Sequence, residues 1–365
     1  MLNNIHLWIG AYLRQRVTRC PLPLPPPTKG GGSTTHIIFS IVDHFEPRWG
    51  GVARDTEIER TERFLSSYGA LVQKHRDPSG VPPKYSFFYP IDEYTKECVD
   101  RVADFCRKGF GEVEVHLHHK DDTEATLRQK LLHAVDVYTS HGLLNTHKKT
   151  GLTQYGFIHG NWSLCNSRAD GKWCGVNEEL RVLRETGCYA DFTLPSAPSD
   201  TQTSKINSIY YAKNTTAPRS HDRGVDVAAG KAPSGDLMII QGPLMLNWHD
   251  RKIENGALMG NNPVTPRRVR LWVDAGVHVA GRPQWLFIKI HNHGCQGDHL
   301  TDGFFDGLDR MFTHLEKGYN DGKNFRLHYV TSREMYNMIR AAEEGKDGDP
   351  SQYRDHVLLS NVKKT

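Results

Sequence analysis

The stretch Val113–Asp122, Val-Glu-Val-His-Leu-His-His-Lys-Asp-Asp, holds more metal-competent side chains than any other ten residues of the sequence. Its alternation of apolar and polar residues predicts a strand with Glu114, His116 and His118 on one face. The acidic residues at its end predict that a helix follows. Two imidazoles on one face of a strand end could bind a metal ion or transfer protons.

A third imidazole, His119, leaves open which two of His116, His118 and His119 act together. The period of two favours His116 with His118, because alternate residues of a strand share a face. The alternative is a solvated strand face whose imidazoles are hydrogen-bonded to their neighbours. Three histidines in four residues, beside an inward-facing glutamate, favour a metal or catalytic site instead.

Other predicted strands also end in ionisable residues. The strand at His36–Val42 runs into Asp43-His44-Phe45-Glu46, and the strand at Trp285–His291 runs into Asn292-His293. Two further strands end at His159 and at Asp191. Because parallel strands bring their carboxyl ends to one rim, we expect these groups to meet there. Imidazoles with a carboxylate and no thiolate fit Zn²⁺, and also Co²⁺, Ni²⁺ or Fe²⁺.

Apolar strands alternate with helical stretches, which indicates an α/β fold with a largely parallel sheet. The predicted strands are His36–Val42, Tyr85–Tyr89, Val113–His118, Tyr155–His159, Cys188–Thr193, Leu237–Gln241, Trp285–His291 and Arg326–Val330. The predicted helices are Arg54–His75, Tyr94–Arg107, Asp122–His141, Asn177–Thr186, Asp302–Lys317 and Ser332–Glu344.

The folded body is expected at 36–345, with a loop-rich elaboration at about 194–284. Residues 1–35 are expected to be a disordered or linker-like basic arm, rich in proline and glycine, and 346–365 a C-terminal tail. The apolar run Leu7–Leu13 is too short for a transmembrane segment and lacks the flanks of a signal peptide. A weak peripheral membrane contact of this arm is the remaining alternative.

The charge and the cysteine content argue against two classes of protein: nucleic-acid-binding proteins and proteins built on a disulfide framework. The formal charge is +4, and residues 1–35 hold four basic residues and no acidic one, so the other 330 balance 42 basic against 42 acidic residues. A balanced body gives no reason to expect nucleic acid as a partner. The seven cysteines include no Cys-x-x-Cys pair, which argues against a disulfide framework and favours the cytoplasm.

Taken in chain order, the strand ends Asp43-His44, His116-Leu-His118, Asp191 and Ile288-Lys-Ile-His291 resemble the polysaccharide deacetylase family, the NodB-homology or carbohydrate esterase family 4 group. The resemblance implies a distorted (β/α)7 barrel over about 36–330. It implies Asp43 as base, Asp191 as the residue that orients it and His291 as general acid. His44 stands where the family has a second, metal-binding Asp, and His116, His118 and His119 depart from its spacing of four.

The function that this implies is a metal-dependent hydrolase, with His44, His116 and His118 as ligands, that deacetylates N- or O-acetylated sugars of a polysaccharide or glycolipid. His159, Trp162 and His293 would contact the carbohydrate substrate. One alternative is a catalytically degenerate carbohydrate-binding protein on the same barrel. A second is a metal-dependent amidohydrolase acting on a small molecule.

Overall fold

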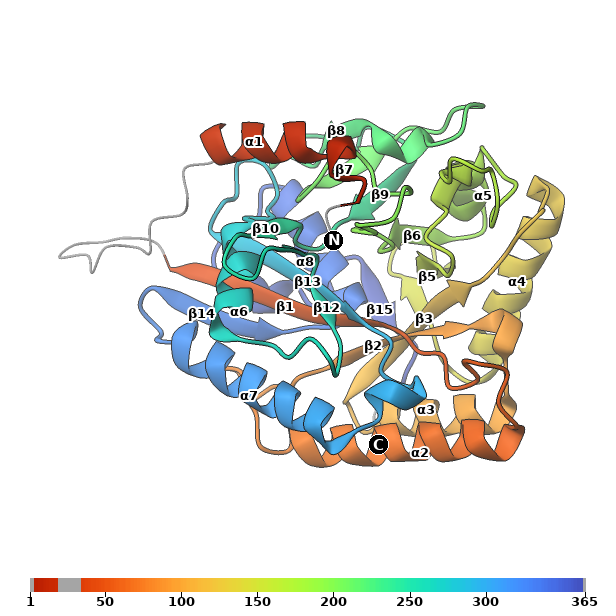
Figure 1. The fold of residues 1–365 in the computed structure, drawn as a ribbon, viewed down its shortest axis with the longest axis horizontal. Helices are drawn as coiled ribbons and strands as arrows, with labels where there is room; N and C mark the ends of the chain where they lie inside the picture. The colour runs from red at the N-terminus through yellow and green to blue at the C-terminus, as the bar shows by residue number, and fades with distance from the viewer. Residues whose placement is uncertain (1–2, 19–33, 364–365) are drawn as a thin grey trace.

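The computed structural model describes residues 3–18 and 34–363, and it shows an α/β fold built around one large sheet (Figure 1). Its central strands are all parallel to one another. In spatial order they are β13 (Trp285–Asn292), β1 (Thr35–His44), β2 (Tyr85–Pro90), β3 (Gly111–Leu117), β5 (Thr153–His159), β6 (Cys188–Asp191) and β9 (Leu237–Ile240). The predicted α/β class with a mostly parallel sheet is therefore confirmed.

The two ends of this sheet carry short strands. β12 (Ala257–Leu258) extends it beyond β13, while β7 (Ile209–Ala212) and β8 (Gly224–Asp226) add antiparallel strands beyond β9. The path of pairings over the described residues is open, from β12 at one end to β8 at the other. Closure of the sheet into the (β/α)7 barrel therefore stays a prediction.

Five further strands lie off this path. β14 (Phe325–Tyr329) pairs with the first half of β1. β4 (Asn145–His147) pairs with β5 and with β15 (Leu358–Ser360), so the end of the predicted C-terminal tail belongs to the fold. β10 (Met245–Asn247) and β11 (Lys252–Glu254) form a separate hairpin within the loop-rich segment 194–284.

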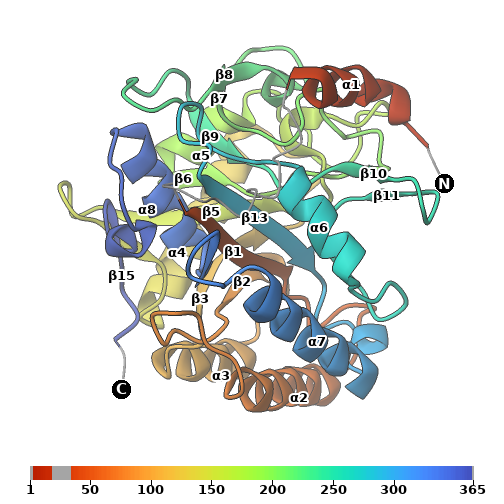
Figure 2. The same ribbon diagram turned by 90° about the vertical axis from the view of Figure 1, so that its left-hand side faces the viewer.

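Helices flank the sheet, and α2, α3 and α7 lie together along one side of it (Figures 1 and 2). The longer helices of the body are α2 (Arg54–Val72), α3 (Lys96–Arg107), α4 (Glu124–Ser140), α5 (Glu179–Glu185), α6 (Pro266–Asp274), α7 (Asp302–Gly318) and α8 (Ser332–Glu343). Every predicted helix is present, with ends shifted by a few residues. α6 was not predicted, although Thr265 caps it and Pro266 opens it.

α8 covers the amino ends of the central strands. The amide of Ser332 donates to Ser86, near the start of β2, at 2.8 Å. Arg333 pairs with Glu112, near the start of β3, at 2.8 Å, and both side chains are buried. The carboxyl ends of the parallel strands meet at the opposite rim of the sheet, on which polar groups can gather.

The N-terminal segment packs onto the body, which corrects the predicted arm for these residues. A 3₁₀ helix, Ile5–Leu7, is followed by α1 (Ile9–Thr18), with Trp8 and Tyr12 buried. Gln15 of α1 accepts a hydrogen bond of 3.1 Å from Asn207, shortly before β7. A hydrogen bond of 2.7 Å from Gln15 to the carbonyl of Ile206 fixes the helix there. The Pro- and Gly-rich residues 19–33 lie outside the described residues.

The aromatic residues that suggested a membrane contact thus face the protein. Across residues 3–18 and 34–363, no helix combines the length and the apolar character needed to cross a membrane.

Candidate active site

The carboxyl ends of β1 and β3 bring one carboxylate and three imidazoles together. β1 ends at His44, and Glu46 follows two residues later. β3 ends at Leu117, so that His116 and His118 flank its last residue. We call His44, Glu46, His116 and His118 the Glu46 cluster.

Glu46 is the centre of this cluster. Its Oε1 atom lies 3.0 Å from Nε2 of His116 and 3.1 Å from Nε2 of His118. Its Oε2 atom accepts a hydrogen bond of 2.8 Å from Gln296, and Nδ1 of His44 is 4.0 Å from Oε1. Burial opposes ionisation of Glu46, but the hydrogen bonds from His116 and His118 outweigh it and hold its pKa well below the ordinary value. Glu46 is therefore a buried carboxylate with its charge retained.

The contacts of His116 restrict its protonation. Its Nδ1 atom lies 3.0 Å from the carbonyl oxygen of Ile158, which can only accept, so Nδ1 carries a proton. Its Nε2 atom faces Glu46, which also accepts. Burial lowers the pKa of His116 and opposes a second proton on the ring. The space between Nε2 and Glu46 thus calls for a positive charge, either a proton or a metal ion.

His118 joins the cluster to the solvent side of the site. Its Nδ1 atom lies 3.1 Å from Asp92, in the 3₁₀ helix Ile91–Glu93 after β2, and its Nε2 atom contacts Glu46. Burial lowers its pKa, but hydrogen bonds to Asp92 and Glu46 outweigh burial and raise the pKa of His118 to about 10. The ring is therefore cationic at neutral pH unless a metal ion replaces its proton.

Glu93 adds a second carboxyl group, whose pKa is shifted in the opposite direction to that of Glu46. It lies with Asp92 and His118, and their potential ligand atoms are all within 4.8 Å of one another. Burial, together with the charges of Asp92 and Glu46, raises the pKa of Glu93 to about 7 against the effect of His118. Its Oε2 atom is buried without a hydrogen-bond partner. The site thus combines an ionised carboxylate with a carboxyl group that holds its proton near neutral pH.

Two of the three predicted substrate-binding residues form a wall beside this cluster. The ring of His293 stacks on that of His44 with centroids 4.5 Å apart. Trp162 meets both rings edge to face, at 6.4 Å from His44 and 6.3 Å from His293. Burial lowers the pKa of His293 to about 4, so this wall is uncharged at neutral pH. The third, His159, lies elsewhere, as described below.

The predicted catalytic residues are not gathered around Glu46. Asp43 accepts hydrogen bonds of 2.9 Å from the Tyr85 hydroxyl and 2.9 Å from the Gly294 amide, and burial raises its pKa to about 7. His291 lies on β13, where it pairs with Ala257 of β12. Burial lowers the pKa of His291 well below the ordinary value, so its ring is neutral.

Asp191, at the end of β6, belongs to a different buried network. Its carboxylate accepts from the Thr193 hydroxyl at 2.7 Å. Lys289, on β13, donates to the carbonyl of Leu194 at 2.6 Å, and its charge favours ionisation of Asp191. Burial nevertheless raises the pKa of Asp191 to about 7. These contacts tie β6 to β13 and do not involve Glu46.

His119, two residues beyond the end of β3, does not join the Glu46 cluster. Its Nε2 atom lies 3.2 Å from Glu179, the first residue of α5. His159, from the end of β5, lies against the same carboxylate at 3.9 Å and is fully buried. These two imidazoles belong to a second group of side chains next to the first.

The sequence interpretation missed the central role of Glu46 and of Glu93. Glu46 was visible as one of three ionisable residues after the first strand, but it lies beyond the strand, where periodicity gives no direction. Asp92 and Glu93 follow the second predicted strand, where such a pair of carboxylates is equally typical of a helix start. For Glu179, at the start of a helix, nothing in the sequence separated a buried ligand from an ordinary first-turn acid.

No family model matches the chain, and no curated protein matches it either. Among solved structures, the chain is similar to a GH57 branching enzyme from the hyperthermophilic archaeon Thermococcus kodakaraensis, in complex with glucose, at 9% identity and a TM-score of 0.43, over 86% of this chain and 72% of that chain. It is also similar to a GH57-type branching enzyme from Pyrococcus horikoshii, at 11% identity and a TM-score of 0.44, over 86% of this chain and 71% of that one. These values describe a distant similarity of fold.

The predicted metal-dependent deacetylase is corrected by these findings. The similar solved structures are GH57 branching enzymes rather than deacetylases. The carboxylate in contact with the imidazoles is Glu46, whereas Asp43, the predicted base, is bonded to Tyr85 and Gly294. The motif resemblance was carried by the order of the strand ends, which many α/β folds can share.

Proposed function

We propose that the protein is a carbohydrate-active enzyme that cleaves or transfers a glycosidic bond, with Glu46 and Glu93 as its reacting carboxyl groups. The observation that carries this proposal is the contrast between the two groups on either side of His118. Hydrogen bonds keep Glu46 ionised, while burial raises the pKa of Glu93 to about 7. Glycosidic bond cleavage commonly uses such a pair, one carboxylate as nucleophile or base and one carboxylic acid that protonates the leaving oxygen.

The surroundings of the pair suit a sugar. Asp92, on the solvent side, presents a charged acceptor for hydroxyl groups, and the half-buried ring of Trp162 presents an apolar face beside His293. Sugars offer both kinds of surface, so a site with an aromatic wall and a polar floor can hold a ring in one orientation. A carbohydrate is the substrate class that we assign to the site.

The test is an assay of the full chain on a panel of α- and β-linked oligosaccharides, with reducing-end release and product length as readouts. We expect Glu46→Gln and Glu93→Gln each to lower kcat/KM by about 10²-fold or more, because each removes one acid–base group. Glu62→Gln is the matched control, since Glu62 is an exposed carboxylate paired with Arg101 on the helical side. Unchanged turnover in both site variants, or no turnover by the wild type on any glycoside, would refute the proposal.

The metal ion predicted at His44, His116 and His118 is a separate proposal about the same cluster. It is supported by the positive charge that the contact between His116 and Glu46 requires. A bound cation would take Glu46 as a ligand and leave Glu93 and Asp92 as the free carboxyl groups. Elemental analysis decides between the two states: His116→Ala should remove about one metal ion per chain if the ion is there, and leave the metal content unchanged if a proton fills the gap.

A further inference from the structure

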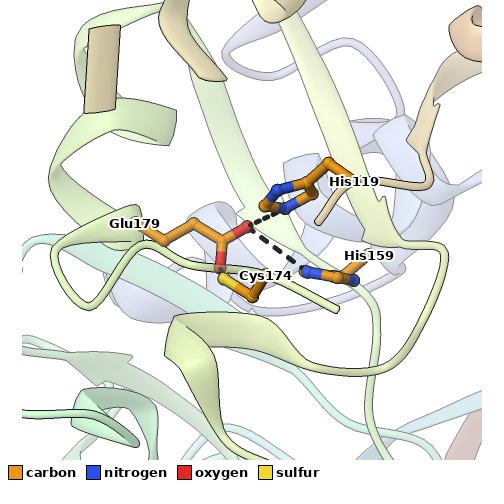
Figure 3. Close-up of side chains that lie close together, drawn as sticks. All are labelled: His119, His159, Cys174 and Glu179. Atoms are coloured by element: carbon orange, nitrogen blue, oxygen red, sulfur yellow. Dashed lines mark hydrogen bonds and ion pairs between the residues drawn. The ribbon is translucent and has the colours of Figure 1, made fainter. Parts of the chain in front are cut away.

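A second cluster of metal-competent side chains lies next to the Glu46 cluster. It consists of His119, His159, Cys174 and Glu179, whose potential ligand atoms all lie within 4.8 Å of one another (Figure 3). All four residues are buried. They come from four separate segments: the exit of β3, the end of β5, the loop after β5 and the first residue of α5. Burying four polar side chains together is costly, because each has lost its hydrogen bonds to water. A strong favourable interaction among them must offset this cost.

The carboxylate of Glu179 lies at the centre of this group. Its Oε1 atom is 3.2 Å from Nε2 of His119 and 3.9 Å from Nε2 of His159, and its Oε2 atom is 3.4 Å from Sγ of Cys174. Figure 3 shows the two rings and the sulfur directed at the same carboxylate. Nε2 of His159 is fully buried and has no hydrogen-bond partner. An unpartnered buried ring nitrogen that faces a carboxylate is costly unless something fills the space between them.

The outer contacts of His119 orient it as a ligand. Its Nδ1 atom lies 3.1 Å from Asp122, which is itself held by Lys130 at 2.7 Å. A carboxylate at Nδ1 keeps the ring proton on that side and leaves the Nε2 lone pair free to point inward. A carboxylate behind a histidine, with a vacant lone pair in front, is the usual arrangement of a metal-binding imidazole.

The sulfur of Cys174 accepts from two backbone amides, and it also lies 3.5 Å from the carbonyl oxygen of Val176. The backbone amides of Asn166 and Val176 both point at Sγ, at 3.3 and 3.4 Å. Amide donors stabilise a thiolate rather than a thiol, and the thiolate is the form that binds metal ions. Gly175 lets the loop approach closely, since a Cβ atom there would lie 2.6 Å from the carbonyl oxygen of Asp122.

His159 differs in its outer contact, because its Nδ1 atom accepts a hydrogen bond of 3.2 Å from the Asn161 amide. Coordination through Nε2 would move the ring proton to Nδ1 and break this bond. The bond is at the long end of the normal range, so its loss is small beside the free energy of binding a structural metal ion.

We propose that His119, His159, Cys174 and Glu179 form a closed, four-coordinate zinc site with a structural role. Two imidazoles, one thiolate and one carboxylate are ligand types that zinc takes, in its preferred number of four, and complete burial leaves no open position for catalysis. The charges also balance, since one thiolate and one carboxylate neutralise Zn²⁺ in a medium where net charge is expensive. The site does not depend on the reaction proposed at Glu46.

The structural role of the ion would be to fix the segment 160–178, between β5 and α5, in one conformation. A three-residue 3₁₀ helix, Leu164–Asn166, is its single regular element, and Trp162, Cys165, Asn166 and Trp173 have left-handed backbone angles. A loop of this length has little regular backbone pairing to define one conformation and depends on other contacts instead. Zinc bound to Cys174 would fix this loop to β3, β5 and α5, and would hold Trp162 beside the Glu46 cluster.

The test uses the full chain, purified without chelators, then exchanged into Co²⁺. We expect about one tightly held zinc per chain at this site, and a cobalt protein with a thiolate-to-metal charge-transfer band, which the Glu46 cluster cannot produce because it holds no cysteine. Cys174→Ser should abolish the band and lower metal affinity by about tenfold or more. Cys165 is a buried cysteine of the same loop whose sulfur contacts Ser220. Cys165→Ser should keep both the charge-transfer band and the metal affinity.

A second measurement keeps the proposal testable if Cys174→Ser does not fold. X-ray absorption at the zinc edge of the wild type should show one sulfur ligand at about 2.3 Å with nitrogen and oxygen ligands. Zinc without a sulfur ligand, a wild type that binds no metal, or a charge-transfer band that persists in Cys174→Ser would each overturn the proposal. Sulfur ligation lost only in Cys165→Ser would also overturn it.

Discussion

The Nε2 atom of His118 lies 3.1 Å from Oε1 of Glu46, which places a ring from the end of β3 against a carboxylate from the end of β1. The other nitrogen of the same ring faces Asp92. The imidazole of His118 therefore links the buried Glu46 to the more exposed Asp92. The pKa of His118 depends on the charges of both carboxylates.

This contact predicts a change in the pKa of His118. In Glu46→Gln, after treatment with a chelator, we expect that pKa to fall from about 10 towards 6.5, because one of the two carboxylates that hold the proton is gone. NMR titration of the imidazole measures it, with Glu62→Gln as control. A His118 that still titrates near 10 in Glu46→Gln would show that Asp92 alone sets its pKa.

The proposed acid role of Glu93 predicts a pH profile. Activity on a glycoside should fall as the pH rises through about 7, because Glu93 then loses the proton that the leaving oxygen needs. The dependence of kcat/KM on pH measures this, and the alkaline limb should disappear from the residual activity of Glu93→Gln. An alkaline limb unchanged in that variant would assign it to another group.

Glu114 predicts how stability changes with pH. It is fully buried on β3, and burial outweighs hydrogen bonds from Tyr189, the Gly156 amide and Asn145 to raise its pKa from 4.5 to about 7. The folded state therefore holds a proton that the unfolded chain releases above pH 4.5, so stability is lost as the pH rises from 4.5 to 7. The loss is on the order of 3 kcal/mol.

Urea unfolding at pH 5 and pH 7.5 measures this effect. Glu114→Gln carries no titrating proton, so its free energy of unfolding should change less between the two pH values than that of the wild type. An equal change in both proteins would show that other buried carboxyl groups, such as Asp43, dominate the dependence.

The buried ion pair under α8 predicts a large loss of stability. Arg333→Met should lower the free energy of unfolding by about 3 kcal/mol or more, because it leaves Glu112 charged and buried without its partner. Arg101→Met, which breaks the exposed pair with Glu62, should cost less than about 1 kcal/mol. Similar losses in the two variants would contradict a role of burial.

The N-terminal helix gives a prediction about local stability. Trp8→Ala should release α1 from the body, because Trp8 and Tyr12 supply its buried side chains. Hydrogen exchange should then speed up in residues 5–18 and stay unchanged in α2. Val17→Ala is the control, since Val17 is 84% exposed. Unchanged exchange in Trp8→Ala would show that backbone contacts such as that to Ile206 hold the helix.

The helices and strands that could be predicted from the sequence are those whose hydrophobic pattern matches the way they pack in the structure. Buried strands such as β1 and β13 are long apolar runs, and an amphipathic helix such as α4 has a clear period. α1 escaped prediction because its apolar residues are few and a Pro- and Gly-rich run follows, so that packing on Ile206, far away in the sequence, decides its position. α6 was hidden by its short length and loop-rich surroundings.

Within the site, the period of two placed His116 and His118 on one face, and the structure brings both to Glu46. His119, beyond the end of β3, contacts Glu179 instead, so adjacent histidines belong to different clusters. The position of Cys174 could not be predicted, because a loop with left-handed residues has no periodicity from which to derive a direction. Chemistry located on strands was visible in the sequence, and chemistry located on loops was not.

The pairing of β1 has a consequence for synthesis of the chain. One edge of this strand is paired in its second half with β2, which follows soon after it, and in its first half with β14. The other edge pairs with β13, which begins at Trp285. A nascent chain, or a protein shortened before that residue, would expose one edge of a largely apolar strand. Unpaired edges of this kind join to other chains and aggregate. Folding of the sheet should therefore be completed late, and the growing chain should need protection by chaperones until β13 has been made.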